Sequence, residues 1–198
     1  ANEDQYKSLT FALDLSPTQN FLLTMGNHDA GRVQDGDFKA AYDMYLKHCG
    51  KYLKDVDTSV PYYDKWINGY HFIVLCTEGA EWDGAYISDK QLTWFEEKLA
   101  EGAKDGKPIF VMCHQALNYT HPRTDTPDNQ IGPAGDKIKD IIKKYPQVIY
   151  MSGHTHNGFG YSPVVSYGEG TFIDIPPMRG TTAYGYESSG VYWYVRVY

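Results

Sequence analysis

The sequence predicts an α/β fold in which helices cover a sheet of buried strands. Strand-like and helix-like patterns alternate between residues 20 and 151, and this alternation is typical of layered α/β domains. Three apolar runs end in short polar clusters that contain histidine. Because open α/β sheets bind their ligands beyond the carboxyl ends of the strands, we expect these clusters to meet in one site.

The first half of the chain is predicted to contain a buried strand, a helix and a hairpin. The apolar run 20–25 ends at a glycine, as short buried strands commonly do. Residues 35–50 place apolar side chains at helical spacing between an acidic N-terminal cap and a final glycine. Two strand-like runs then flank Asn68-Gly69, a dipeptide typical of tight hairpin turns.

The second half is predicted to alternate helices with strands that end in histidines. The clearest helix spans 88–106 and begins with capping-box spacing. Residues 107–114 and 147–158 are apolar strands that run into histidines, and the amphipathic segment 136–146 between them is predicted to be a helix. Several strands separated by Gly- and Pro-rich turns are expected in residues 164–198.

Composition describes one acidic globular domain, predicted to span residues 1–198. The formal net charge of −7 argues against a broad nucleic-acid or anionic-membrane surface. No apolar run is long enough for a membrane span. Three cysteines without CxxC spacing favour buried thiols over a disulfide framework. The acidic, tyrosine-rich composition favours a secreted, extracytoplasmic bacterial protein slightly over a cytoplasmic one.

Three short stretches carry the candidate chemistry: Gly26–Asp29 (GNHD), His114 at the end of VMCH, and Gly153–His156 (GHTH). A single buried histidine is more often a satisfied core residue, but three clusters in order at strand ends favour a metal site. Imidazole nitrogens and an amide oxygen suit Mn, Fe or Zn better than Ca or Mg. The His-x-His spacing can direct His154 and His156 to different ions.

The ordered blocks GNHD, an isolated histidine and GHTH resemble the last three blocks of the calcineurin-like metallophosphoesterases, over Phe21 to Asp174. The resemblance implies an αββα fold, a two-sheet β-sandwich flanked by helices, here lacking its N-terminal strands. It also implies metal-dependent hydrolysis of phosphodiesters or phosphomonoesters at a dinuclear centre with a bridging hydroxide. The implied partner is a small phosphorylated substrate.

Individual roles also follow from the resemblance. The implied metal ligands are Asn27, His114 and His154 for one metal and His156 for the other. The two metals would be divalent or trivalent transition ions, Mn, Fe or Zn. His28 would contact the phosphate and assist the leaving group. Asp29 would hydrogen-bond His28 and fix its tautomer.

Two earlier blocks of the family, Asp-x-His and Gly-Asp-x-x-Asp, are not found before Gly26. They supply most ligands of the second metal, so only one metal site is substantially encoded here. We therefore expect the chain to be the C-terminal part of a longer enzyme, partnered by a missing N-terminal segment of the same protein. The chain alone is expected to be inactive or impaired, with unpaired sheet edges.

Two alternative functions stay open at this point. One is a non-catalytic metallophosphoesterase-like scaffold, and the other is a single-metal binding domain that uses one amide and two histidines. The missing acidic blocks favour the scaffold. The intact pair of His28 and Asp29 disfavours it, because a scaffold has no need of a phosphate-contacting histidine with an orienting carboxylate.

Four further polar residues have two interpretations each. His121, Arg123 and Asp125 lie in the loop after His114. They either face substrate or are ordinary solvated loop residues, and the second interpretation is about twice as common for such positions. Arg179 is the fourth residue. It either binds phosphate through its guanidinium or forms a surface salt bridge.

Overall fold

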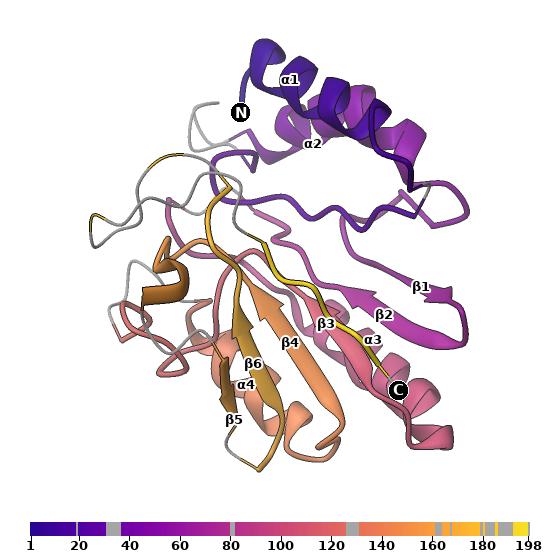
Figure 1. The fold of residues 1–198 in the computed structure, drawn as a ribbon, viewed down its shortest axis with the longest axis vertical. Coiled ribbons are helices and arrows are strands. Elements are labelled where there is room, and N and C mark those ends of the chain that lie inside the picture. The colour runs from indigo at the N-terminus through magenta and orange to yellow at the C-terminus, as the bar shows by residue number, and fades with distance from the viewer. Residues whose placement is uncertain are drawn as a thin grey trace.

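One mixed sheet of six strands organises the described part of the chain (Figure 1). The computed structural model describes residues 1–18, 20–30, 37–79, 82–125, 131–160, 164–166, 168–178, 180, 185 and 192–197. The strands are β1 Tyr63–Ile67, β2 Tyr70–Val74, β3 Ile109–Met112, β4 Val148–Ser152, β5 Val164–Ser166 and β6 Thr171–Asp174. The α-helices are α1 Glu3–Asp14, α2 Phe38–Cys49, α3 Asp89–Gly102 and α4 Pro133–Ile142. Short 3-10 turns lie at η1 Gly50–Tyr52, η2 Ala103–Asp105 and η4 Gly158–Gly160.

The strand order β1-β2-β3-β4-β6-β5 places β3 and β4 in the middle of the sheet. Strands β2, β3, β4 and β6 are parallel, and β1 and β5 are antiparallel edges. Beyond the carboxyl ends of β3 and β4 the pairing continues, because Gly153 N–H donates to His114 O at 3.0 Å. This pairing sets the second and third histidine clusters side by side.

The larger core fills the space between the sheet and helices α3 and α4, which lie behind the sheet in Figure 1. Alternate residues of β3 point into it, so Ile109 and Val111 are fully buried. Cys113 continues the alternation and is buried too. This confirms that Cys113 is a core thiol that faces away from the site, and the three cysteines are buried and free as predicted.

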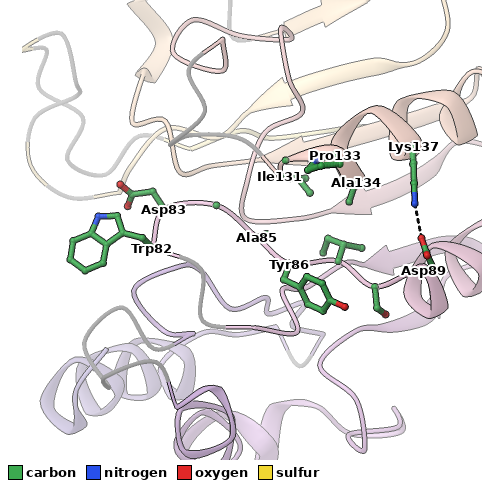
Figure 2. A pocket seen from close by; sticks show the side chains of 13 residues that line it. Trp82, Asp83, Ala85, Tyr86, Asp89, Ile131, Pro133, Ala134 and Lys137 are labelled. Carbon is green, nitrogen blue, oxygen red and sulfur yellow. Dashed lines mark hydrogen bonds and ion pairs between the residues drawn. The ribbon is translucent and has the colours of Figure 1, made fainter.

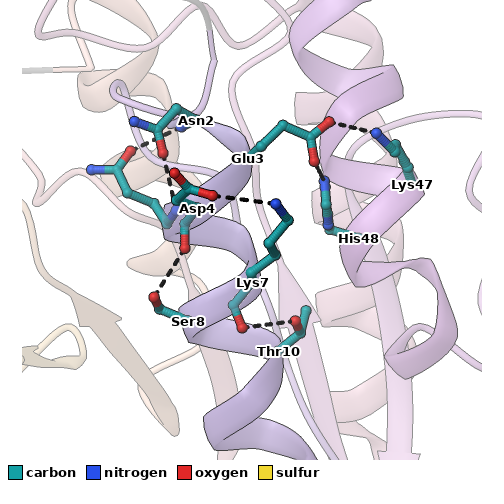
Figure 3. Close-up of polar contacts among 9 residues, drawn as sticks. Asn2, Glu3, Asp4, Lys7, Ser8, Thr10, Lys47 and His48 are labelled. Atoms are coloured by element: carbon teal, nitrogen blue, oxygen red, sulfur yellow. Dashed lines mark hydrogen bonds and ion pairs between the residues drawn. The ribbon is translucent and has the colours of Figure 1, made fainter.

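Helices α1 and α2 form a second layer that holds the segment leading to the first cluster (Figure 1). Figure 3 shows Glu3 of α1 paired with both Lys47 and His48 of α2. The ring of Tyr6 stacks on His48, with centroids 5.1 Å apart. Tyr6 is buried, so the apolar contact rather than the exposed ion pairs provides most of the stabilisation.

The expected helix caps and hairpin are confirmed. Asp37 caps α2 by accepting the N–H of Ala40 at 3.0 Å. Ser88 accepts from Gln91 N–H at 3.2 Å, but the Gln91 side chain bonds to Cys76 instead of closing the capping box. The Asn68-Gly69 turn joins β1 and β2 with both residues at positive φ, as a type I′ turn requires.

The prediction of a strand at residues 20–25 is wrong, because this segment pairs with tyrosine hydroxyls rather than with a neighbouring strand. Leu23 N–H donates to the Tyr63 hydroxyl at 2.8 Å. Leu23 O accepts from the hydroxyls of Tyr45 and Tyr63 at 3.1 and 3.0 Å. The tyrosine hydroxyls satisfy both backbone groups of Leu23, and residues 20–25 form no ladder. The segment is nevertheless anchored, as the buried Met25 shows.

The predicted α/β class is confirmed, although the described residues form one sheet rather than the two of the expected sandwich. The tail explains the difference, because β6 pairs in parallel with β4 and β5 pairs with β6. These C-terminal strands therefore extend the first sheet, and residues 192–197 form no strand. The central strands are paired without a gap, so no unpaired edge lies between them. None of the helices in the described ranges has the length and apolar character needed to cross a bilayer.

Candidate metal centre

Side chains from three distant segments meet at the carboxyl end of the sheet. Asn27 Oδ1 lies 3.1 Å from His114 Nε2. The same nitrogen lies 3.2 Å from His154 Nδ1. The two imidazole rings are 5.1 Å apart at an angle of 71°. The structure thus brings together the three residues predicted to ligate one metal, which we call the Asn–His–His cluster.

Gly26 is required because the His114 ring occupies the space of a side chain. A Cβ at this position would lie 2.8 Å from both Cε1 and Nε2 of His114. Carbon atoms do not approach this closely without displacement, so any other residue would push the ring away. Gly26 therefore has a steric role. Its φ is not positive, so the backbone conformation alone does not require glycine here.

The Asn27 amide is oriented by a loop that the sequence analysis did not identify. Its Nδ2 donates to Asp83 Oδ1 at 2.9 Å and to the Trp82 carbonyl at 3.3 Å. Both contacts use the amide hydrogens, so Oδ1 is the atom that faces the histidines. Asp83 follows a tryptophan in a Gly-containing loop, and no spacing in the sequence links it to Asn27.

Both histidines of the cluster are held neutral. Burial, together with the charges of His154, His156 and His28, lowers the pKa of His114 to about 3. Burial likewise lowers the pKa of His154 to about 4, although Asp83 acts in the opposite direction. Metal ions bind the neutral imidazole, so both rings carry lone pairs for a ligand at neutral pH.

His28 and His156 lie at the exposed rim of the cluster. Each is close enough for its charge to lower the pKa of His114. Burial lowers the pKa of His156, and Arg123 and His28 lower it further. His156, predicted to bind the second metal, and His28, predicted to contact the phosphate, therefore lie beside the Asn–His–His cluster.

The Asp29 side chain contacts the backbone of its own turn. Its Oδ2 accepts the N–H of Gly26 at 2.9 Å, and the Asp29 and Ala30 amides donate to Gly26 O. The carboxylate therefore stabilises the turn that presents His28. The hydrogen bond from His28 to Asp29 stays a prediction.

His154 and His156 do not lie on an extended strand, contrary to expectation. Their φ angles are 67° and 55°, both in the left-handed region that L-residues seldom adopt. Strand β4 ends at Ser152, and Thr155 N–H turns back to Gly153 O at 2.7 Å. The directions of the two rings are thus set by a turn and not by strand pleating.

The loop after His114 contributes one residue to the site. Arg123 donates from Nη1 to Thr155 O, and its charge lowers the pKa values of His154 and His156. His121 is buried beside the Thr120 hydroxyl at 3.1 Å, so it is not a solvated loop residue. Asp125 is exposed, as expected. Arg179 lies outside the described residues.

The Asn–His–His cluster fits one transition metal. With bonds of about 2.0–2.1 Å, ligand atoms around one ion lie about 3.0–3.4 Å apart, and the observed spacings of 3.1 and 3.2 Å fall in this range. His154 Nε2 is buried without a hydrogen-bond partner among the described residues. The described ranges contain no group of three His, Cys, Asp or Glu placed to hold a metal. The third donor of this cluster is the amide of Asn27. A second metal would have His156 as its one predicted ligand.

A pocket of about 600 Å³ adjoins the cluster through the loop that orients Asn27. Figure 2 shows Trp82 and Asp83 at one end of it and the ion pair of Lys137 with Asp89, 2.7 Å long, at the other. Its wall is completed by the start of α4 near Pro133. The histidines are not part of the lining, so the pocket lies beside the cluster and not over it.

Comparisons with known proteins identify the family and the fold of the chain. The family model of the calcineurin-like phosphoesterases matches residues 2–158. The structure is similar to the crystal structure of a dimetal phosphatase from Danio rerio, with a TM-score of 0.56 and 9% sequence identity. The likeness covers 92% of this chain and 80% of that chain, and at this identity it concerns the fold alone. No curated protein matches the sequence.

Proposed function

The chain belongs to the calcineurin-like phosphoesterase family, and we propose that it carries the metal-binding part of an active site that hydrolyses phosphate esters. The observation that carries this proposal is the Asn–His–His cluster. At the carboxyl end of the sheet, Asn27 Oδ1 and His154 Nδ1 lie 3.1 and 3.2 Å from His114 Nε2, so donor atoms from three sequence blocks meet there. This is the edge at which open α/β sheets bind ligands.

Asn27, His114 and His154 would hold the metal, which we propose to be Mn, Fe or Zn from the nitrogen-rich donor set. A bound ion of this kind supplies Lewis-acid polarisation of a phosphate oxygen. The neutral state of both histidines leaves them able to bind it. Asp83 would keep the Asn27 amide oxygen aimed at the ion, as groups that hydrogen-bond metal ligands commonly do.

His28 would act on the substrate rather than on the metal. It lies at the exposed rim of the cluster, where a small phosphodiester or phosphomonoester has access. As an imidazolium it would hydrogen-bond the phosphate and donate a proton to the departing oxygen. Asp29 would support this role by stabilising the turn through Gly26.

A second candidate function is a single-metal binding domain. One observation favours it: of the predicted ligands, those of one metal meet within hydrogen-bonding distance, while His156 stands at the rim without a second donor set among the described residues. Turnover separates the two functions, because a binding domain retains the metal but hydrolyses nothing.

The first test is metal content combined with hydrolysis. The chain would be loaded with Mn²⁺ or Zn²⁺ and assayed with bis-p-nitrophenyl phosphate and p-nitrophenyl phosphate, beside His114→Ala and His28→Ala. We expect one tightly bound metal per chain, lost in His114→Ala and retained in His28→Ala. We expect low turnover, abolished in both variants.

The outcomes separate the hypotheses. Metal content that is unaffected by His114→Ala would reject the cluster as a metal site. A metal lost in His114→Ala, without turnover in the wild type, would favour the single-metal binding domain. Turnover that survives His28→Ala would reject the role proposed for His28 while leaving the metal site in place.

A further inference from the structure

The turn that carries His154 and His156 has a strained backbone. Both residues have positive φ, at 67° and 55°, a conformation in which the Cβ crowds the following carbonyl oxygen. Thr155, between them, is fully buried. Such conformations persist only where the surrounding contacts over-determine them.

Two charged residues from other segments hold Thr155. Its hydroxyl donates to the Asp174 carboxylate and lies 3.0 Å from each of the two oxygens. Its carbonyl accepts a hydrogen bond from Nη1 of Arg123. The side chain and the backbone of Thr155 are thus each restrained by a different element. We call Arg123, Thr155 and Asp174 the Thr155 clamp.

Asp174 is a rigid anchor for the clamp. It is the last residue of β6 and lies in register with Ser152 of β4, two residues before His154. Ile175 N–H donates to Ser152 O, which continues the ladder past the strand end. The indole N–H of Trp193 donates to Asp174 O at 3.1 Å. The anchor therefore stands beside the point where the histidine turn leaves the sheet.

The Asp174 carboxylate is not explained by packing. Only 2% of the residue is exposed, and a buried carboxylate costs free energy relative to an apolar side chain of similar size. Its carboxylate hydrogen-bonds the Thr155 hydroxyl and the side chain of Asn157, which directly follows His156. The Asp174 carboxylate thus costs free energy to bury and restrains the strained turn of His154 and His156. Such a group is expected where the position of the turn matters.

We propose that Asp174 is a positioning residue, which acts through Thr155 to keep His154 in the left-handed backbone from which its ring meets His114. Arg123 has the same role on the carbonyl side of the turn. The inference rests on the proposed metal site, because it is the placement of a metal ligand that the clamp would secure.

The test compares Thr155→Val, which removes the hydroxyl at nearly constant volume, with Thr155→Ser, which retains it. The Zn²⁺ dissociation constant would be measured by chelator competition, well below the unfolding temperature, and the Co²⁺ absorption spectrum would report ligand geometry. We expect Thr155→Val to weaken Zn²⁺ binding about 10- to 100-fold and to alter the Co²⁺ bands. Thr155→Ser should retain both properties.

Wild-type affinity and spectrum in a folded Thr155→Val chain would overturn the inference. Asp174→Ala and Asp174→Asn provide a second comparison if Thr155→Val fails to fold, since asparagine retains an acceptor oxygen. Alanine should weaken Zn²⁺ binding and asparagine should not; equal affinities would count against positioning. His114→Ala distinguishes the two levels of failure, because unchanged Zn²⁺ affinity there would overturn the metal site itself.

Discussion

Gly26 shows how one absent side chain shapes the candidate metal centre. The His114 ring lies where a Cβ would be, at 2.8 Å from two of its atoms. The Asn27 side chain follows directly and its oxygen contacts the same ring. Displacements of a few tenths of an ångström therefore matter for the placement of these side chains, because protein interiors are close-packed and transmit such displacements.

We predict that Gly26→Ala displaces the His114 ring and weakens metal binding at least tenfold, because overpacking moves a ligand. It should also destabilise the fold by about 1–3 kcal/mol. Gly50→Ala is the matched control, because a Cβ there meets nothing within 4 Å and its φ is −55°. Isothermal titration with Zn²⁺ and urea unfolding measure both effects. Equal metal affinities in the two variants would contradict the steric role.

We also predict a pH-dependent stability difference between the metal-free wild type and Asp174→Asn. Burial raises the pKa of Asp174 to about 6 from its usual 3.8, while Thr155, Asn157 and Arg123 act in the lowering direction. Between pH 3.8 and about pH 6, the Asp174 carboxyl therefore holds a proton in the folded state that it has released in the unfolded state. The stabilisation is complete below pH 3.8 and is lost as pH rises through 6.

The size of this difference follows from the shift in pKa. Between pH 4 and pH 7 the wild type should lose roughly 2 kcal/mol relative to Asp174→Asn. Urea unfolding of both proteins at several pH values measures it, and other groups cancel in the comparison. A difference that is constant with pH would show that Asp174 does not titrate in this range.

At the scale of elements, parallel pairing of β3 and β4 accounts for the site. The register Met112↔Met151 and the hydrogen bond from Gly153 N–H to His114 O set two strand ends level. Alternation along β3 directs Cys113 into the core, so His114 points the other way. The first cluster reaches the same edge without a strand, held by tyrosine hydroxyls and the α1–α2 layer.

Docking of helix α1 on α2 should depend on Tyr6 and hardly on Glu3. Tyr6 is buried against His48, so Tyr6→Ala should destabilise the chain by roughly 3 kcal/mol. The Glu3 side chain is 43% exposed, so water screens its ion pairs with Lys47 and His48. Glu3→Ala should therefore change stability little. Urea unfolding compares the variants, and a larger loss for Glu3→Ala would contradict this view.

At the scale of the whole molecule, a metal that binds the folded state alone must stabilise it. A free Zn²⁺ concentration of about 100 times the dissociation constant should add roughly 2.7 kcal/mol. The increase should appear as a higher midpoint in thermal unfolding, reversed by EDTA. His114→Ala should show no increase, and the same increase in that variant would indicate that zinc binds elsewhere.

The sequence by itself determined the α/β class, the helices with their caps, the hairpin and the residues of the Asn–His–His cluster. These features follow from local periodicity, from turn chemistry and from the order of the histidine blocks, which also indicated the family. The segment 20–25 was predicted wrongly as a strand. An apolar run specifies burial but not its hydrogen-bond partners, which here are tyrosine hydroxyls some 20–40 residues away.

Only the tertiary structure decided which groups support the cluster. Asp83 orients Asn27 across 56 residues of chain, and Asp174 holds Thr155 across 19. Neither aspartate belongs to a spaced motif, because contacts between loops depend on where strands end in space and not on separation along the chain. The left-handed backbone at His154 and His156 was hidden for the same reason: it is imposed by contacts from β6 and a distant arginine, whereas local preference favours other conformations.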